Sequence, residues 1–317
     1  MTPTLAQLLA AGEISRLDAH FGECVARLGA GDLDDAGRAD LATLAALASR
    51  ATAAGHVCLP LAEIAGAPVL RAATGDDGPS ERGDEAARAA LGTLSWPALE
   101  AWQAVLLRSA AAGDGSRVTP LVLDASRRLY LHRLWEAERE LKAQVSRRVA
   151  CPPDAVDESW LSGALRRLFP RGADDIDAAV EWRALACLVV MTRRFAVVSG
   201  GPGTGKTTGV IRLLALLIEQ AFAAGKTLRI ALVAPTGKAA ARLQETVDAQ
   251  RGQLPVPESV RAALPRETTT IHRRLGSYVT GFYYGRDNRI PYDIVVVDEA
   301  SMVDLPLMAH LVGALED

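Results

Sequence analysis

Apolar residues in the first part of the chain recur at the spacing expected of helices. Leu5, Leu8 and Leu9 stand at positions i, i+3 and i+4, and residues 17–28 continue the apolar stripe. Residues 41–61 are rich in alanine and leucine, which favours a buried helix that ends near Gly55, because alanine has the highest helix propensity. The pattern predicts a largely helical beginning to the chain.

A different pattern follows before the middle of the sequence. Residues 119–135 predict two short strands around a turn at 124–127, and a charged helix is expected over 136–149. Because Pro152 and Pro153 come directly after that helix, we place a domain boundary there. The first domain is expected to cover residues 1–150 and to be mainly helical.

Apolar strands without polar alternation occur only in the second part of the chain. The expected strands are 195–198, 229–233 and 294–297, with helices over 176–193, up to about 224, and from about 238. Such strands, separated by helices, are typical of a parallel sheet that is covered on both faces. Residues 151–317 therefore predict an α/β domain.

Composition limits the class of protein. The chain has 317 residues, of which 49% are hydrophobic, so a disordered or fibrous protein is excluded. The net charge of −3 argues against a generally basic nucleic-acid-binding coat, although residues from Ala186 onward include 15 basic and 12 acidic residues. Only four of the 35 basic residues are lysine, so each lysine suggests a need for a compact ammonium group.

The sequence also indicates a compartment. The four cysteines lie far apart without a CxxC pair, which argues against a disulfide framework or a zinc site. The N-terminus lacks the features of a signal peptide, and no apolar run approaches the roughly 20 residues of a membrane span. We expect a cytoplasmic protein that does not bind membranes.

The strongest chemical motif is GGPGTGKTT, which fits the phosphate-binding pattern G-x-x-x-x-G-K-[ST] between an expected strand and an expected helix. Its glycines allow backbone N–H groups to surround phosphate oxygens, and the helix N-terminus attracts anions. Lys206 would bridge the β- and γ-phosphates of ATP, and the Thr207 hydroxyl would bind Mg²⁺. The expected nucleotide-binding residues are Gly200, Gly201, Pro202, Gly203, Thr204, Gly205, Lys206, Thr207 and Thr208.

A second motif, IVVVDEAS, places two carboxylates directly after an apolar strand. Asp298 would hold Mg²⁺, as the corresponding aspartate of P-loop enzymes does. Glu299 is expected to orient and deprotonate the attacking water. A base beside the metal ligand indicates hydrolysis of ATP, and Lys206, Asp298 and Glu299 are the expected catalytic residues.

Two further segments predict contacts with nucleic acid. In APTGKAAARL, the turn amides, the Thr236 hydroxyl, Gly237 and Lys238 are suited to a backbone phosphate, although Thr236 would also serve as a helix N-cap. In TTTIHRRLG, Thr270 and His272 stand at a helix start, which is equally compatible with a capped amphipathic helix.

An aromatic run stands in a glycine-flanked loop at 282–284. Single-strand binding proteins stack bases on such side chains, so this loop is a candidate DNA platform. A hairpin that packs its own aromatic residues accounts for the same pattern, and both interpretations stay open.

Together these motifs resemble the first motor domain of superfamily-1 DNA helicases of the RecD type. In the N-terminal half, LDAHF (17–21), GHVCLPL (55–61) and PLVLDASRRLYLHRLWEAE (120–138) are similar to the alpha subunits of exodeoxyribonuclease V, which form the RecD family. The resemblance covers essentially the whole chain.

The resemblance implies a RecA-like P-loop NTPase fold for the second domain. It also implies an ATP-dependent motor that moves 5′ to 3′ on single-stranded DNA within a complex with RecB-like and RecC-like subunits, in double-strand break repair and recombination. The N-terminal domain would dock on the large partner. Carried over by motif, the nucleotide, Mg²⁺ and DNA residues are those named above.

Two departures from the family pattern stand out. Where the family has a glutamine that reads adenine, this sequence has Arg183, which can donate to adenine N7 but cannot accept from the exocyclic amine. The sequence also stops at Asp317, before the family's next motif and second RecA-like domain. We therefore expect the fold to be truncated at its C-terminal side, with nucleotide bound weakly at most and neither rapid ATP hydrolysis nor unwinding by this chain alone.

Two alternatives remain on sequence grounds. One is a stand-alone RecD-like or relaxase-type helicase that needs no RecB or RecC. The other is a nucleotide-binding interaction subunit without motor function, against which the base at Glu299 argues.

Overall fold

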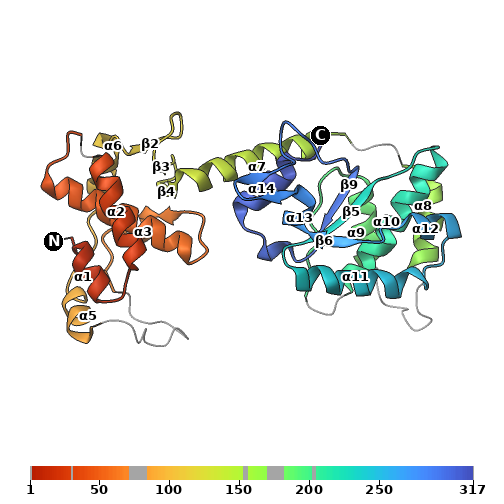
Figure 1. The fold of residues 1–317 in the computed structure, drawn as a ribbon, viewed down its shortest axis with the longest axis horizontal. Coiled ribbons are helices and arrows are strands. Elements are labelled where there is room, and N and C mark those ends of the chain that lie inside the picture. The colour runs from red at the N-terminus through yellow and green to blue at the C-terminus, as the bar shows by residue number, and fades with distance from the viewer. Residues whose placement is uncertain are drawn as a thin grey trace. The chain divides into compact units, whose positions relative to one another are not determined.

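The computed structural model describes residues 2–29, 31–70, 84–152, 156–169, 182–201 and 205–316, without the side chains of residues 158 and 182–184. It divides into two compact units, Met1–Arg139 and Glu140–Asp317 (Figure 1). The division falls inside helix α7 (His132–Ala150), some ten residues before the boundary expected from the prolines. The last turns of α7 belong to the second unit, where Arg148 and Glu140 bond to other parts of that unit.

The N-terminal unit is built mainly from helices. They are α1 (Leu5–Ala10), α2 (Arg16–Leu28), α3 (Asp35–Ala53), α4 (Leu61–Ile64), α5 (Glu85–Leu91) and α6 (Leu99–Arg108). The fully buried Leu41 and Leu44 place α3 in the centre of the core. Helix α2 lies so close to α3 that a Cβ atom on Gly22 would stand 2.4 Å from the Ala42 carbonyl oxygen. The predicted helical character of this region is confirmed.

A small sheet completes the N-terminal unit. Its strands, in the order β1-β4-β3-β2, are β1 (Leu59–Pro60), β4 (Arg128–Leu131), β3 (Leu121–Leu123) and β2 (Ala112–Gly113). Strands β3 and β4 are antiparallel, as the pattern over residues 119–135 predicts. Arg127 adopts a left-handed conformation with φ 63° in the turn between them, and the Asp124 carboxylate accepts from the Arg128 N–H at 2.8 Å.

The second unit contains a parallel sheet and seven further helices within the described residues. The strands are β5 (Ile230–Ala234), β6 (Thr268–Thr270) and β9 (Ile294–Val297), and a separate hairpin joins β7 (Ser277–Tyr278) to β8 (Gly281–Phe282). The helices are α8 (Glu158–Leu168), α9 (Trp182–Met191), α10 (Lys206–Ala223), α11 (Gly237–Arg251), α12 (Glu258–Ala263), α13 (Ile271–Leu275) and α14 (Leu305–Gly313).

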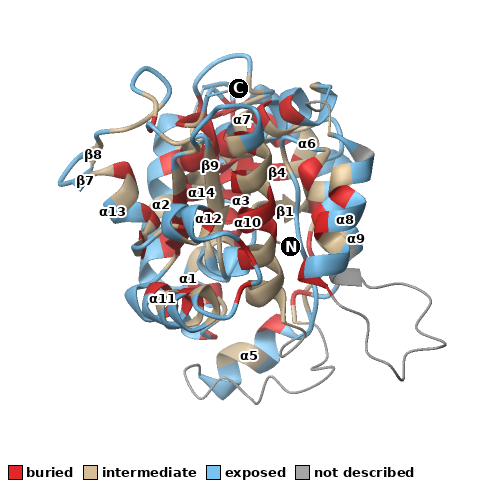
Figure 2. Cartoon of the chain, turned by 90° about the vertical axis from the view of Figure 1, so that its right-hand side faces the viewer, coloured by how far each residue is buried: buried red, intermediate tan, exposed pale blue. Residues whose placement is uncertain are grey.

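The parallel sheet has the order β6-β5-β9 and is covered on both faces. Because side chains alternate along a strand, Leu232 and Val296 enter the core formed with α8–α12. Val233 and Val297 instead enter the core formed with α13 and α14. Buried positions line the inner faces of these helices (Figure 2). The predicted α/β class with a parallel sheet is confirmed.

In the parallel sheet, one predicted strand is wrong and one unpredicted strand is present. Residues 195–198 form no strand, and Val197 is 80% exposed. An apolar run of this length becomes a strand only where a neighbour pairs with it, and within the described residues β9 pairs only with β5. The third strand is β6, a run of three threonines that pairs with β5 in parallel register.

No helix in the described part of the chain combines the length and the apolarity that crossing a membrane requires.

Candidate functional site

Helix α10 begins without a side-chain cap. Its N-cap is Gly205, whose φ of 76° is in the left-handed region that glycine adopts without strain. Among the residues that the structure describes, no side chain accepts from the N–H groups of its first turn, where Thr207 and Thr208 are half-buried. Such an end is suited to an anion, because several N–H donors and the positive end of the helix dipole meet there.

The Lys206 side chain folds back over the loop that precedes α10. Its ammonium donates to the carbonyl oxygens of Gly200 at 2.5 Å and Gly201 at 2.8 Å. Pro202, Gly203 and Thr204 lie outside the described residues. The ammonium and the uncapped helix end provide the donor set that a polyphosphate needs, so the residues present fit a nucleotide.

The two carboxylates after β9 differ in how they are held. The backbone N–H of Asp298 donates to the Val233 carbonyl at 2.9 Å, so the sheet fixes this residue. Glu299 lies one residue beyond, is exposed, and adopts φ 51° and ψ 41° at the start of a 3₁₀ turn over Ala300–Met302. A left-handed conformation at a residue with a Cβ atom costs about 1–2 kcal/mol. Such strain is often found at functional sites.

Three of the predicted segments meet at one edge of the sheet. Val233 of β5 is level with Val297 of β9, and Ala234 is level with Thr270 of β6. Asp298, Thr236 and Thr270 therefore stand at the carboxyl ends of three adjacent parallel strands, where open α/β sheets bind their ligands. Among the described residues, neither Asp298 nor Glu299 forms an ion pair with Lys206.

Both threonines at this edge cap helices. The Thr236 hydroxyl accepts from the Ala239 N–H at 3.2 Å, and the Thr270 hydroxyl accepts from the Arg273 N–H at 3.2 Å. Each hydroxyl still has a proton to donate, so capping does not prevent a phosphate contact. Gly237, Lys238 and His272 are exposed beside them.

The aromatic run after β7 is partly used for packing. The Phe282 ring lies 5.8 Å from the His272 ring and 4.7 Å from the His310 ring. Tyr283 is 66% exposed and meets Tyr284 edge to face at 4.9 Å. Phe282 therefore packs against side chains of α13 and α14, Tyr283 and Tyr284 pack against each other, and of the three rings only that of Tyr283 is largely open.

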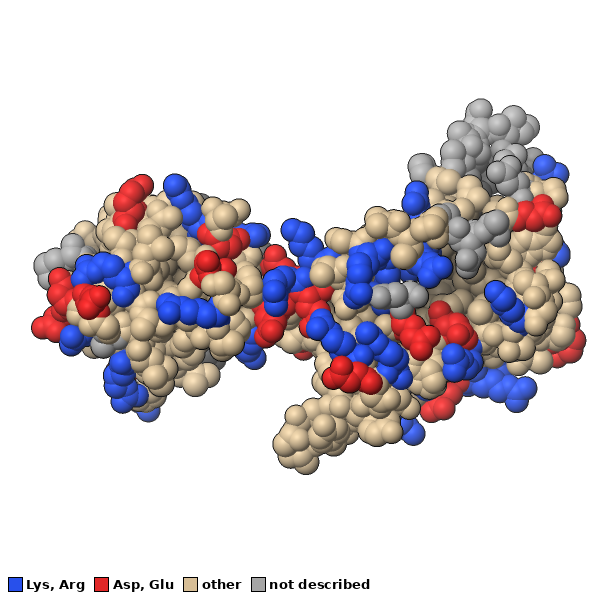
Figure 3. All heavy atoms as spheres, turned by 90° about the horizontal axis from the view of Figure 1, so that it is seen from above, with Lys and Arg blue, Asp and Glu red and all other residues tan. Residues whose placement is uncertain are grey.

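Other side chains give the electrostatic setting. On the face drawn in Figure 3, basic and acidic side chains are interspersed over both units, as the modest net charge suggests.

Arg183 lies in the first turn of α9, and its side chain is outside the described part of the structure. Burial raises the pKa of Cys187 to about 12, so it remains a protonated core thiol.

Sequence reasoning missed two features of this unit. One is the left-handed backbone of Glu299, which no residue type announces. The other is Arg148, a buried arginine on α7 that bonds the end of α14. The sequence shows that Glu140, Gln144 and Arg148 are spaced one helical turn apart, but the carbonyl partners of Arg148 lie more than 160 residues later in the sequence.

Comparisons with known proteins match both units. Residues 10–130 match the RecBCD enzyme subunit RecD N-terminal domain, and residues 184–317 match an AAA domain, a nucleotide-binding module. The RecBCD enzyme subunit RecD of Mycobacterium tuberculosis is 38% identical over 96% of this chain and 46% of its own length.

Further relatives extend the comparison. The same subunit of Mycolicibacterium smegmatis is 39% identical over 85% of this chain and 43% of its own length. The ATP-dependent RecD2 DNA helicase of Deinococcus radiodurans is 31% identical over 90% of this chain and 33% of its own length. The chain thus spans about half the length of the RecD subunits that it matches along most of its sequence.

Proposed function

We propose that this chain belongs to the RecD family, whose subunits it matches at 38–39% identity along most of its sequence, and that the protein is the helicase subunit of a RecBCD-type helicase–nuclease. Its activity would be ATP-driven 5′ to 3′ movement on single-stranded DNA in double-strand break repair and recombination. The observation that carries the proposal is the chemistry at one sheet edge. There an acidic pair and two threonine-capped helix starts stand level, in the same unit as an uncapped helix that follows a glycine loop.

In this proposal the loop and first turn of α10 hold the nucleotide phosphates. Lys206 would exchange the carbonyls of Gly200 and Gly201 for phosphate oxygens, and the backbone amides that follow Gly205 would donate to the same group. Thr207 and Asp298 would hold Mg²⁺, which when bound neutralises negative charge on the phosphates. The remaining residues proposed to bind the nucleotide are Pro202, Gly203, Thr204 and Thr208, and Arg183 would contact the adenine ring.

Glu299 is the proposed general base. It stands one residue beyond the sheet, exposed and in a left-handed conformation, whereas Asp298 is bonded to β5. A carboxylate there can accept a proton from water while Asp298 remains with the metal. A general base typically contributes about 10²–10⁴-fold to the rate.

The DNA strand would follow the edge formed by β5 and β6. Thr236, Gly237 and Lys238 would contact one phosphate, and Thr270 and His272 the next. These contacts carry no base specificity, because they address the sugar–phosphate backbone. A translocase needs this kind of contact, since it must bind every sequence that it passes.

The partners of the protein follow from the same family membership. We propose docking on RecB-like and RecC-like subunits through residues 1–150, with the ATPase domain in residues 151–317, in the cytoplasm. The RecD N-terminal domain match over residues 10–130 supports the docking role.

The proposal is tested by ATP turnover of the full-length protein with and without single-stranded DNA. Lys206→Ala should abolish nucleotide binding, and Glu299→Gln should retain binding while turnover falls by about 10²–10⁴-fold. Lys226→Ala, which alters an exposed lysine in the loop after α10, is the matched control and should behave as wild type. Unchanged turnover in both site variants would rule out the motor.

A stand-alone helicase is the second candidate, and the match to a RecD2 helicase over 90% of this chain favours it. The two candidates differ in their need for partners. Co-purification of the full-length protein with a RecC-like subunit, lost on removal of residues 1–150, supports the complex. Unwinding by the full-length protein without any partner supports the stand-alone helicase.

A further inference from the structure

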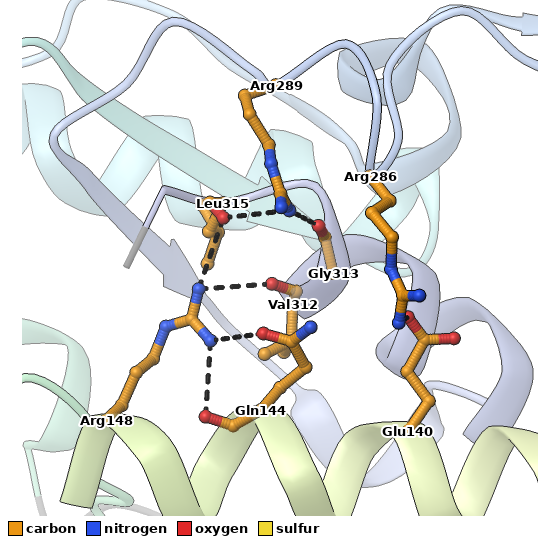
Figure 4. Close-up of polar contacts among 8 residues, drawn as sticks. All are labelled: Glu140, Gln144, Arg148, Arg286, Arg289, Val312, Gly313 and Leu315. Carbon is orange, nitrogen blue, oxygen red and sulfur yellow. Dashed lines mark hydrogen bonds and ion pairs between the residues drawn. The ribbon is translucent and has the colours of Figure 1, made fainter. Parts of the chain in front are cut away.

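Two arginines bond the carbonyl groups at the C-terminal end of α14. Arg148 of α7 donates to the carbonyl oxygens of Val312 at 3.4 Å and Leu315 at 3.2 Å (Figure 4). It also donates to the Glu316 carbonyl at 3.1 Å. Arg289 donates to the Gly313 carbonyl and, at 3.2 Å, to that of Leu315. We call Arg148 and Arg289 the α14 clamp. Guanidinium groups suit this place, because the last carbonyls of a helix are unpaired and carry partial negative charge.

The clamp is built into the unit rather than lying on its surface. Arg148 is 4% exposed, and Gln144, one turn earlier on α7, is 2% exposed and accepts from Arg148 at 2.9 Å. One turn earlier still, the Glu140 carboxylate accepts from Arg286 at 2.8 Å (Figure 4). A Cβ atom on Gly313 would stand 3.2 Å from the same carboxylate, so the glycine allows α7 to approach.

The loop before β9 holds α14 from a second side. The Ile290 N–H donates to the Ala314 carbonyl at 2.9 Å, and His310 bonds the Tyr284 carbonyl at 2.8 Å. Arg289 belongs to the same loop. The C-terminal end of α14 is therefore fixed by α7 and by the loop together.

The opposite end of α14 leads to the acidic pair. The Asp304 carboxylate caps the helix by accepting from the Leu307 N–H at 2.8 Å. Between β9 and this cap stand only Asp298, Glu299 and the short turn Ala300–Val303, in which Met302 N–H donates to the Glu299 carbonyl at 3.0 Å. Asp298 is bonded to β5, whereas the hydrogen bond recorded for Glu299 within the described residues is to the turn that leads into α14.

We propose that Arg148, together with Arg289, is a positioning residue for Glu299: the clamp fixes the axial position of α14, and α14 fixes the turn that carries the base. A nine-residue helix moves as a rod, so a shift at its clamped end reaches the turn at its other end. Helix α10, which follows the nucleotide-binding loop, packs in the core that it shares with α8, α9, α11 and α12, whereas α14 packs in the core that it shares with α13. The clamp therefore acts on turnover and not on nucleotide binding.

This inference rests on the proposed role of Glu299 in hydrolysis, and the experiment separates the two. In the full-length protein, Arg148→Met keeps the volume of the aliphatic stem but removes the donors to α14. We expect kcat to fall at least about tenfold, since misplacement of a catalytic group by about 1 Å can cost 10²-fold. KM for ATP and affinity for a fluorescent ADP analogue should change less than about twofold, because the substitution displaces the general base and not the groups that bind the nucleotide.

Four further variants complete the test. Arg148→Lys should recover part of kcat, because an ammonium reaches one carbonyl but cannot span Gln144 and α14 together. Arg289→Met should lower kcat in the same way, and the double variant should lose less than the product of the two single losses, since both arginines donate to Leu315. Arg166→Met removes an exposed arginine of α8 and should leave kcat unchanged.

All variants are assayed below the onset of unfolding, which is measured for each. An Arg148→Met protein that is folded, binds ADP normally and turns over ATP at the wild-type rate overturns the inference. Loss of kcat and ADP affinity in parallel also overturns it, because a structural defect would account for both. If Glu299→Gln is as active as wild type, the proposed function itself fails.

Discussion

Helix α10 of the second unit begins differently from four helices of the N-terminal unit. In the N-terminal unit, Thr4, Ser15, Asp34 and Asp84 each cap a helix through a side-chain oxygen. In the second unit, side chains likewise cap α8, α11, α13 and α14, but α10 begins at a left-handed glycine with no side-chain cap. The eight capped helix ends are satisfied internally, whereas the first turn of α10 has donors left for a ligand.

The largest stability effect is expected in the closed core of the N-terminal unit. Trp102 of α6 is fully buried, so Trp102→Ala should lower the free energy of unfolding of that unit by about 3–5 kcal/mol. Leu107→Ala, on the same helix but 81% exposed, should cost less than about 0.5 kcal/mol. Denaturant titration measures both. Equal effects would mean that α6 does not pack as described.

The next effect tests the close contact between α2 and α3. Gly22→Ala would place a methyl group 2.4 Å from the Ala42 carbonyl oxygen and should destabilise the unit by about 1–3 kcal/mol. Gly163→Ala in α8 adds a methyl group that meets nothing within 4 Å. It should be neutral or stabilise by up to about 1 kcal/mol through helix propensity. Calorimetry of the two variants should show shifts of opposite sign.

A third prediction compares the two left-handed residues other than glycine among those described, one in each unit. Arg127→Gly and Glu299→Gly should each raise the free energy of unfolding by about 1 kcal/mol, because glycine adopts φ 63° or 51° without strain. Only Glu299→Gly should also remove ATP turnover. Stabilisation without loss of turnover at Glu299 would contradict its role as the base.

The smallest effect concerns an exposed ion pair that joins the beginnings of β5 and β9. The hydrogen bond and charge of Arg229 hold the pKa of Asp293 below its ordinary value. A lowered folded pKa contributes stability above the ordinary pKa of aspartate, and that stability is lost as pH falls through the folded value. Asp293→Asn should therefore reduce stability at pH 7 by at most about 1 kcal/mol and should flatten the acid side of the profile. Unfolding midpoints from pH 7 down to pH 2 measure this, and an unchanged acid profile would contradict it.

Periodicity predicted much of the fold. The turn between β3 and β4, strand β5 to within a residue, and β9 over residues 294–297 all follow from local apolar patterns. The errors arise where the formation of a strand depends on pairing with a neighbouring strand rather than on the local sequence. Three threonines form β6 because β5 offers its edge, and the apolar run at 195–198 forms no strand because no neighbour pairs with it.

The candidate site divides in the same way. The glycine loop, Lys206 and the two carboxylates carry their chemistry in their residue types, so the motif indicates them directly. The left-handed conformation of Glu299 depends on the turn into α14. The role of Arg148 depends on carbonyl groups, which every residue has, and no sequence pattern could identify them.

The central claim is that the uncapped end of α10 and the acidic turn after β9 form one nucleotide site. Amide hydrogen exchange of the full-length protein, with and without Mg²⁺ and a non-hydrolysable ATP analogue, tests it directly. We expect new protection at residues 205–209 and 298–302, with the N-terminal unit unchanged. Unaltered exchange in the first turn of α10 at saturating analogue would contradict it.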